Sequence, residues 1–483
     1  MEQAGLRVAT VETDTVRKTV ERIAHVLEQE DAQAFFVGGC VRDLLLGRPL
    51  HDLDLVVAQE ALGLAHRLAR ALGGAFVLLD EDNAIARIVL RARKGRARCT
   101  VDVAAMRGGD LHADLAARDL TINAMALPVE ALRSALPGDL AEERVIDPFG
   151  GRADLGRRLL RALGPEAFLQ DPLRTLRVVR LAAELDFAVD PDTARWAKEA
   201  APHLWRVSWE RIRDEVARLL RCPRAARFLP LLDAYGLLGQ VFPEVEAGRE
   251  EEALEHLWTV VGSLEAVVLQ LEGAAGHGDA PDLAIDVPDP GDLRRRLDVA
   301  LSDDRTGLFV VKLAALLHHV RPPEVVRRAG RRLRLSEREV RALVTAVVRP
   351  EAEALWEGRE ISPRAVYRFF RACYPIPEAV LLLDLVERLA HGQGPRRDTV
   401  LRVQAVLRLS QEQREVVVDP PRLVDGQALM AALGLPPGPW IGRLLEGIRE
   451  AQAAGEVRTR DEALAWARAA LRSTPQSGMT VPQ

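Results

Sequence analysis

Two aspartates, Asp52 and Asp54, stand two positions apart in the apolar run 51–57. Side chains two apart on a β-strand point to the same face, so both carboxylates converge on one space. Upstream, the apolar run 34–37 is followed by a pair of glycines and then by apolar residues at helical spacing. This order predicts an α/β unit in which a strand, a glycine turn, a helix and a second strand bring two carboxylates beside the turn.

The two carboxylates are typical of a metal site. Like charges held about 7 Å apart on one strand face repel each other, and a hard divalent cation such as Mg²⁺ relieves that repulsion. Asp102, in the strand-like run 99–105, is a third candidate ligand. Three carboxylates on adjacent strands can hold two metal ions for in-line displacement at phosphorus. The alternative is that Asp52 only caps a strand and Asp54 pairs with an arginine.

The glycine pair Gly38-Gly39 favours the metal site over that alternative. Glycines between a strand and a helix let backbone N–H groups approach an anion, and the helix N-terminus adds the positive end of a dipole. Most Gly-Gly turns bind nothing, but here Arg42 and the aspartate pair follow. The combination indicates a site for a nucleotide phosphate.

A run of arginines predicts a second part of the site. Asp171 and Pro172 are typical of a helix cap and first turn, and Arg174, Arg177 and Arg180 then recur every three residues along one side. A carboxylate accepts from an exocyclic amine and a guanidinium donates to a ring nitrogen or carbonyl oxygen. An Asp171/Arg174 pair would therefore accept cytosine or adenine and reject uracil or guanine. The alternative is a helix cap followed by a solvated basic face.

The periodicity predicts an α/β head followed by helices. Residues 13–29 have helical spacing, and from about residue 165 onward leucine and alanine at helical spacing dominate. Strands are predicted at 34–37, 53–58, 75–80, 85–92 and 99–105.

In order and spacing, the motifs resemble those of the class II CCA tRNA nucleotidyltransferases and the related bacterial poly(A) polymerases. They occupy residues 38–54, 118–125, 147–155 and 171–180, with a weaker fifth at 208–212. The resemblance implies a polymerase-β-like α/β nucleotidyltransferase head and an all-α neck, body and tail. The implied domains are 1–164 for the catalytic head, 165–245 for the neck that binds base and RNA, 246–350 for the body and 351–483 for the tRNA-binding tail.

The resemblance also implies roles for the residues of each motif. Asp171 and Arg174 would form the template for the incoming base, with Arg177 and Arg180 on the triphosphate. Arg118 and Asp119 would reach the ribose. The implied activity is template-independent addition of CMP and AMP, from CTP and ATP, to the 3′ end and acceptor arm of tRNA with Mg²⁺. Three further polar residues are interpreted as structural supports: Asn123, Ser208 and Glu210.

Two departures from the family pattern bear on the nucleotides added. Full CCA-adding relatives of this kind have a long flexible loop between the third carboxylate strand and the second motif, whereas only residues 103–117 fill that interval here. Gln170 stands where glutamate often precedes the template aspartate. Both argue against addition of the final A, and the short interval is typical of relatives that add only CC. The resemblance as a whole implies CCA addition and repair, and the alternatives are a CC-only enzyme that needs a partner for the terminal A and a poly(A) polymerase.

The helical body resembles a metal-dependent phosphohydrolase domain whose hallmark is an early histidine followed by a His-Asp pair. His256 is in place, but His318-His319 replaces the pair, and loss of the aspartate removes a bridging ligand. We therefore expect a degenerate body that serves as a spacer and RNA contact. A phosphohydrolase and a binding-only RNA protein are the remaining function classes. In the tail, runs 420–426 and 435–442 match the family, and the helix start suits a phosphate.

Composition agrees with a protein of several domains. A chain of 483 residues is too long for one core. Its net charge of −5 restricts RNA contact to local arginine clusters such as 91–98 or 152–161. Four scattered cysteines predict neither a disulfide framework nor a metal cluster. Because the sequence lacks a signal-peptide core and a transmembrane stretch, we expect a cytoplasmic protein without a membrane partner.

Overall fold

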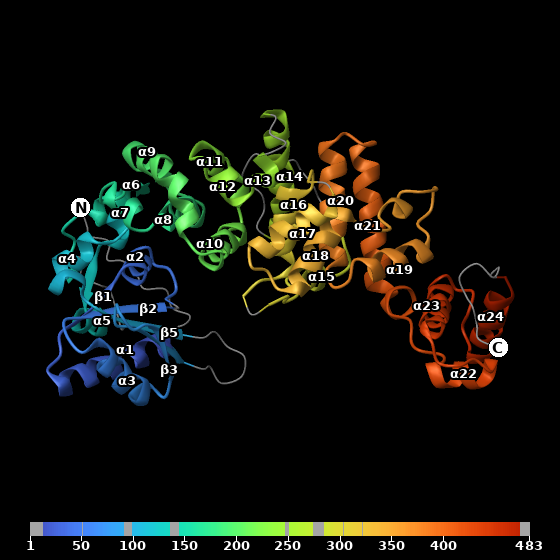
Figure 1. Ribbon diagram of the computed structural model, residues 1–483, viewed down its shortest axis with the longest axis horizontal. Helices are drawn as coiled ribbons and strands as arrows, with labels where there is room; N and C mark the ends of the chain where they lie inside the picture. Colours follow the sequence, from blue (N-terminus) through green and yellow to red (C-terminus); the bar gives the residue numbers. More distant parts are fainter. Residues whose placement is uncertain are drawn as a thin grey trace. The chain divides into compact units, whose positions relative to one another are not determined.

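The computed structural model describes residues 13–50, 52–90, 99–135, 144–246, 251–273, 285–302, 304–320 and 322–473 (Figure 1). The chain forms two compact units, Met1–Val207 with Ala234–Leu237 and Ser208–Asp233 with Leu238–Gln483. The predicted arginine cluster 91–98 lies outside the described residues.

The first unit contains a six-stranded sheet in the order β3-β4-β5-β2-β1-β6. Strands β2 and β5 run parallel, and the other neighbouring strands run antiparallel. The strands of this sheet are β1 (Ala34–Val37), β2 (Asp52–Val57), β3 (Ala75–Asp80), β4 (Ile85–Leu90), β5 (Cys99–Ala105) and β6 (Ala126–Pro128).

The helices of this unit are mostly short. They are α1 (Thr13–Glu30), α2 (Gly39–Leu45), α3 (Ala61–Leu72), α4 (Leu111–Ala116), α5 (Val129–Ala135), α6 (Gly151–Arg157), α7 (Glu166–Gln170), α8 (Leu173–Leu185) and α9 (Pro191–Ala200). Helices α1 and α3 pack together, and α3 covers strands β4 and β5 (Figure 1). On that side the sheet buries alternate residues of β2 and β5, such as Leu53 and Val101, while Asp52, Asp54 and Asp102 lie on the other face.

The predicted five strands and the first helix are confirmed, with ends that differ by at most one residue, and residues 91–92 of the predicted strand 85–92 lie outside the described residues. Short strands were not predicted, because two or three residues carry no periodicity. One of them corrects the expectation of helices alone after residue 165: β8 (Ala188–Val189) pairs in parallel with β7 (Leu159–Leu160).

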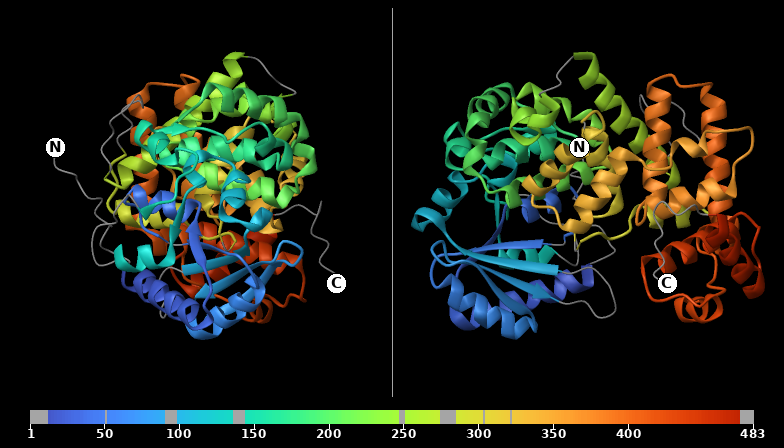
Figure 2. Two further views of the ribbon diagram at one scale, coloured as in Figure 1. Left: turned by 90° about the vertical axis from the view of Figure 1, so that its left-hand side faces the viewer. Right: turned by 45° about the vertical axis from the view of Figure 1, so that its right-hand side comes forward.

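The second unit is helical in its described residues. Figure 2 shows α20 and α21 as an antiparallel pair, and α22, α23 and α24 pack around a small apolar core of their own. The helices that follow α9 are α10 (Trp209–Arg221), α11 (Pro230–Ala234), α12 (Leu237–Val241), α13 (Pro243–Glu246), α14 (Glu251–Leu271), α15 (Pro290–Leu297), α16 (Gly307–Leu317), α17 (Pro323–Arg332), α18 (Glu337–Val348), α19 (Pro363–Ala372), α20 (Pro377–Ala390), α21 (Arg396–Glu412), α22 (Gly426–Leu433), α23 (Pro439–Ala453) and α24 (Arg460–Ser473).

No helix of the described residues combines the length and the apolar character needed to cross a bilayer.

Candidate active site

The predicted carboxylates gather on one face of the central strands. Asp54 of β2 is the register partner of Asp102 in the parallel strand β5. Asp52, one pleat earlier, is opposite Thr100, whose hydroxyl donates to Asp52 Oδ1 at 2.6 Å. Strand pairing therefore places three negative charges side by side, as the alternation of side chains predicts.

Asp54 lies at the centre of this charge cluster. Its pKa is raised to about 6, mainly by burial and also by the negative charges of Asp102 and Asp52. The positive charges of Arg118 and Arg177 lower this pKa but do not cancel the rise. Ionised Asp54 is thus under-compensated by the chain itself at neutral pH. Oxygen ligands with uncompensated negative charge are what a hard divalent cation requires, so Asp52 and Asp54 fit such an ion.

Asp102 has a partner that the sequence reasoning missed. Arg87 of β4 donates to both of its carboxylate oxygens, from Nε at 2.7 Å and from Nη2 at 2.8 Å. The two residues are register partners in antiparallel strands. The signal was present, because Arg87 alternates with the buried Ala86 and Ile88 in a predicted strand. Its pairing with Asp102 depended on the strand order, which the sequence pattern did not reveal.

The glycine turn lies against the same cluster. Gly38 has a φ of +74°, in the left-handed region that favours glycine. A Cβ atom at Gly38 would lie 2.8 Å from Arg118 Nη1 and 3.5 Å from Asp54 Oδ2. Gly39 begins helix α2, where its Cβ position faces the Arg42 guanidinium at 3.6 Å. The first two motifs therefore meet at this turn, where a side chain at Gly38 would have to displace the Arg118 guanidinium.

The second motif connects the turn to helix α8. Buried Arg42 donates to Asn123 Oδ1 at 2.9 Å, and Asn123 Nδ2 donates to Asp119 Oδ1 at 3.0 Å. Asp119 in turn pairs with Arg177 Nε at 3.1 Å. Burial opposes ionisation of Asp119, but Arg177, the Asn123 amide and Arg174 outweigh it and hold its pKa at about 2. Asn123 therefore links Arg42 to Asp119, in agreement with its interpretation as a structural support.

Arg118, predicted to reach the ribose, is held by a second missed residue, Asp114. Arg118 donates to Asp114 Oδ2 from Nε at 3.1 Å and from Nη2 at 2.8 Å. Asp114 is 1% exposed and also accepts from the backbone N–H of Arg107 at 3.3 Å. The spacing of four residues between Asp114 and Arg118 was visible in the sequence and is typical of an ion pair.

The third motif supports the second by close backbone packing. The Asp147 carboxylate accepts from the N–H of Gly151 at 2.7 Å and so caps α6. A Cβ atom at Gly151 would lie 2.3 Å from the Thr121 carbonyl oxygen, so glycine is required there. Buried Asp154 accepts from the Thr121 hydroxyl at 2.8 Å.

Helix α8 presents its arginines to different partners. Asp171 precedes the helix, and its carboxylate accepts from the Leu173 N–H at 3.3 Å. Arg174 bends back and donates to the carbonyl oxygens of Ala117 at 2.9 Å and Ala167 at 3.1 Å. Arg180 is buried and pairs with Glu184. In this conformation the arginines predicted for base and triphosphate do not form one continuous open face.

The body brings the predicted histidines together. His256, His318 and His319 each offer a ring nitrogen within 4.8 Å of the others. Burial and the neighbouring histidines lower the pKa of His256 to about 4. Burial lowers the pKa of His318 to about 3, although a hydrogen bond with the Ala315 carbonyl acts in the opposite direction. A fourth histidine, His391, which the sequence reasoning missed, lies 4.3 Å from the His256 ring.

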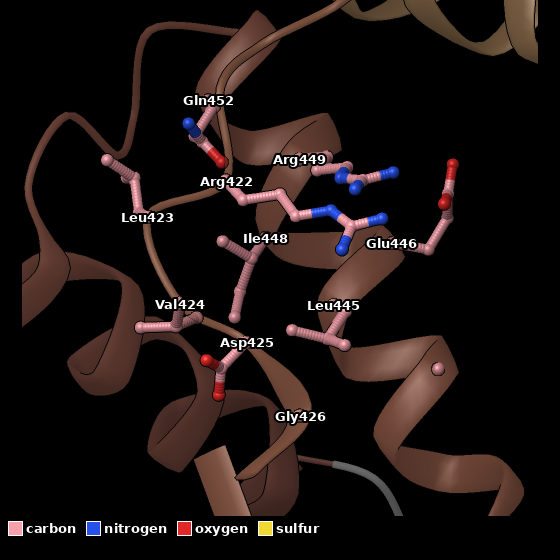
Figure 3. Close-up of a pocket in the computed structure, with 11 residues that line it drawn as sticks. Arg422, Leu423, Val424, Asp425, Gly426, Leu445, Glu446, Ile448, Arg449 and Gln452 are labelled. Atoms are coloured by element: carbon pink, nitrogen blue, oxygen red, sulfur yellow. The ribbon is translucent and has the colours of Figure 1, made fainter. Parts of the chain in front are cut away.

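The first tail run lines a pocket of about 240 Å³ together with α23, to which the second run contributes Gly442. Figure 3 shows the guanidinium groups of Arg422 and Arg449 extending from this pocket in the same direction. Asp425 at its floor caps α22 by accepting from the Ala428 N–H at 2.7 Å. The predicted helix that follows the turn is α23, which begins at Pro439, two residues before the expected start at Ile441.

Comparison with known proteins identifies the family. Residues 34–161 match the poly(A) polymerase head domain, 186–248 an RNA and SrmB binding site of polymerase A, and 311–467 a tRNA nucleotidyltransferase domain 2. A CC-adding tRNA nucleotidyltransferase of Geobacter sulfurreducens is 33% identical over 443 residues, which cover 92% of this chain and 93% of that protein. The chain belongs to the tRNA nucleotidyltransferase and poly(A) polymerase family. This family generally uses divalent metal ions.

Other members of the family differ in the nucleotides they add. A CC-adding enzyme of Thermus thermophilus is 34% identical over 90% of this chain and 92% of its own length. An A-adding enzyme of Deinococcus radiodurans is 31% identical over 92% of this chain and 97% of its own length. Among solved structures, the Thermotoga maritima CCA-adding enzyme with tRNA has a TM-score of 0.60 at 22% identity, and the match covers 97% of this chain and all of that one. That likeness extends the shared fold to both units.

Proposed function

We propose that this protein transfers CMP from CTP to the 3′ end of tRNA and stops after two additions, so that a partner enzyme supplies the terminal A. The assignment to tRNA 3′-end addition rests on family membership and on the names of the relatives that match nearly the whole chain. The restriction to CC rests on the interval between the third carboxylate strand and Arg118. Transfer of nucleotides to tRNA supports the cytoplasmic location that the sequence predicts.

That interval is short, folded and anchored. After β5, the chain forms the 3-10 turn Arg107–Gly109 and then helix α4, with Asp110 capping α4 through the Ala113 N–H at 2.8 Å. Asp114 ties the interval to Arg118 at its C-terminal end. Changing from a pyrimidine to a larger purine in one pocket requires a segment that absorbs a backbone change. The described interval offers only the two glycines of the 3-10 turn for this purpose.

The same interval positions the residue proposed to select the base. Ala117, directly after α4, accepts from Arg174 Nη2 at 2.9 Å. The Ala117 carbonyl therefore couples the interval to Arg174, which with Asp171 is the pair proposed to read the base. We infer that the template is set for cytosine and that the chain has little means of resetting it for adenine.

Asp52 and Asp54 would hold Mg²⁺. Asp102 would be a third ligand once Arg87 no longer donates to one of the two Asp102 carboxylate oxygens. Bound Mg²⁺ would activate the RNA 3′-hydroxyl and neutralise the leaving pyrophosphate. The backbone N–H groups of the glycine turn at Gly38 and Gly39, at the start of α2, would bind the triphosphate beside these carboxylates. Asp114 holds Arg118, and Asn123 holds Arg42. These two arginines would keep the turn and the carboxylate cluster in a fixed position relative to α8.

The test is release of pyrophosphate with CTP, Mg²⁺ and a tRNA transcript that lacks its 3′ end. We expect Asp54→Asn and Asp52→Asn to lower the rate by at least about a thousandfold, because the metal loses its charged ligands. Asp80→Asn, which changes a half-buried aspartate of the edge strand β3 in the same sheet, is the matched control and should keep the parental rate. A normal rate in Asp54→Asn would remove the basis for the assignment.

A further inference from the structure

The body contains a cluster of four histidines that the proposed reaction does not use. His256 belongs to α14, His318 and His319 follow α16, and His391 follows α20. These three helices pack against one another (Figure 1). The ring centroids lie 5.3 Å apart for His256 and His318, and 4.3 Å apart for His256 and His391. Imidazoles from three separate segments of the chain therefore converge on one point.

Backbone hydrogen bonds orient two of these rings for a ligand. His318 Nδ1 lies 2.6 Å from the Ala315 carbonyl oxygen, and His391 Nδ1 lies 2.9 Å from that of Glu387. A carbonyl only accepts, so each Nδ1 carries the proton and each Nε2 keeps its lone pair. Fixing one ring nitrogen on a carbonyl is how proteins commonly present the other to a metal ion.

Unpaired nitrogens at the centre of the cluster point to a missing ligand. His256 Nε2 and His318 Nε2 are both buried and have no hydrogen-bond partner, although Glu387 Oε1 lies 3.6 Å from His318 Nε2. His318 is only 2% exposed, so water does not supply one readily. Ligand nitrogens of His256, His318 and His319 lie within 4.8 Å of one another. Metal–nitrogen bonds of about 2.0–2.1 Å would bring them to about 3.3 Å, a change that small ring rotations can supply.

The neighbouring carboxylates are already neutralised. Glu387 pairs with Arg349, and Asp384 accepts from Arg388 Nε at 2.9 Å. They are therefore poor candidates for the bridging ligands of a dinuclear hydrolase. Imidazole ligands without a carboxylate favour a borderline transition metal such as Zn²⁺ over Mg²⁺ or Mn²⁺.

We propose that the helical body binds one divalent transition-metal ion of the Zn²⁺ class through His256, His318 and His319. His391 completes a four-coordinate, all-imidazole site. The ion joins α14, α16 and α20 and stabilises the body without taking part in nucleotide addition. This site is independent of the carboxylate cluster of the first unit.

The test uses the full chain, stripped with a chelator and titrated with Zn²⁺ and with Co²⁺, whose visible spectrum reports tetrahedral nitrogen coordination. We expect one ion per chain and a rise in the melting temperature with Zn²⁺ but not with Mg²⁺. His391→Ala and His319→Ala remove exposed ligands and should weaken Zn²⁺ binding by about tenfold or more. His203→Ala, an exposed histidine outside the cluster, should bind as the parent does.

Further variants locate the ion. Asp52→Asn/Asp54→Asn should keep the Zn²⁺ stoichiometry, whereas His256→Ala/His391→Ala should lose it and lose the stabilisation by Zn²⁺. Nucleotide addition by His391→Ala should stay within a fewfold of the parent. Three results would each overturn the proposal. They are absence of Zn²⁺ binding at micromolar concentration, full Zn²⁺ binding by His256→Ala/His391→Ala, and a stoichiometry of two Zn²⁺ ions per chain that both disappear in that variant.

Discussion

At the scale of single residues, the site is built on one poorly compensated carboxylate. Asp54 is surrounded by Asp52 and Asp102, and its pKa is raised to about 6. Asp119, equally central, has its pKa lowered to about 2 because arginines and an amide surround it. The first carboxylate is therefore available to a cation, and the second anchors the motif that positions Arg177.

Replacing Asp54 with asparagine should stabilise the metal-free protein while abolishing activity. The raised pKa means that ionised Asp54 destabilises the folded state above pH 6, and this effect disappears as pH falls through 6 toward 3.8. The shift corresponds to at most about 3 kcal/mol, and we expect about 1–2 because the side chain is partly solvated. Thermal unfolding in chelator at pH 7.5 and at pH 4.5 measures it. A gain that is equal at both pH values would contradict this explanation.

Binding of Mg²⁺ should compete with protonation of the same carboxylate. Below about pH 6, the ion must displace a proton from Asp54, so the half-saturating Mg²⁺ concentration should rise by up to about tenfold per pH unit. Above pH 7 it should be constant. Initial rates at several Mg²⁺ concentrations between pH 5 and pH 8 give the profile, and a flat profile would show that Asp54 is not the titrating ligand.

Gly38→Ala should separate backbone strain from loss of the site. Gly38 and Gly73 both have positive φ, but a Cβ at Gly38 meets Arg118 whereas one at Gly73 meets nothing within 4 Å. Both alanine variants should lose about 1 kcal/mol of unfolding free energy. Only Gly38→Ala should also lose CMP addition, by tenfold or more. Equal activity in the two variants would show that the turn plays no part in the reaction.

At the scale of secondary-structure elements, helix α8 should control base choice. Asp171→Ala and Arg174→Ala should lose the preference for CTP over UTP, since both residues belong to the proposed template. Arg177→Ala should instead weaken nucleotide binding and keep the preference, because Arg177 pairs with Asp119. Competition between CTP and UTP at fixed tRNA measures the ratio. If Arg174→Ala is folded, as judged by circular dichroism, and still prefers CTP over UTP, then residues other than Arg174 select the base.

The elements also show what the sequence could and could not predict. Strands β1 to β5 were predicted because each is a short run rich in apolar residues, and the alternation within β2 and β5 placed Asp52, Asp54 and Asp102 on one face. The Arg87–Asp102 pair and the approach of His391 to His256 depend on which elements are neighbours in space. No periodicity within one segment contains that information.

At the scale of the whole molecule, the chain has an α/β unit with the proposed reaction site and a unit that is helical in its described residues. The restriction to CC requires that the interval from β5 to Arg118 and the template arginine act as one rigid piece. The direct measurement is product length at single-nucleotide resolution, with a tRNA transcript that lacks its 3′ end, purified protein, Mg²⁺, CTP and ATP. We predict two added C residues and no further extension, also when a transcript that already ends in CC is offered with ATP. Efficient synthesis of complete CCA by this chain alone would contradict the restriction.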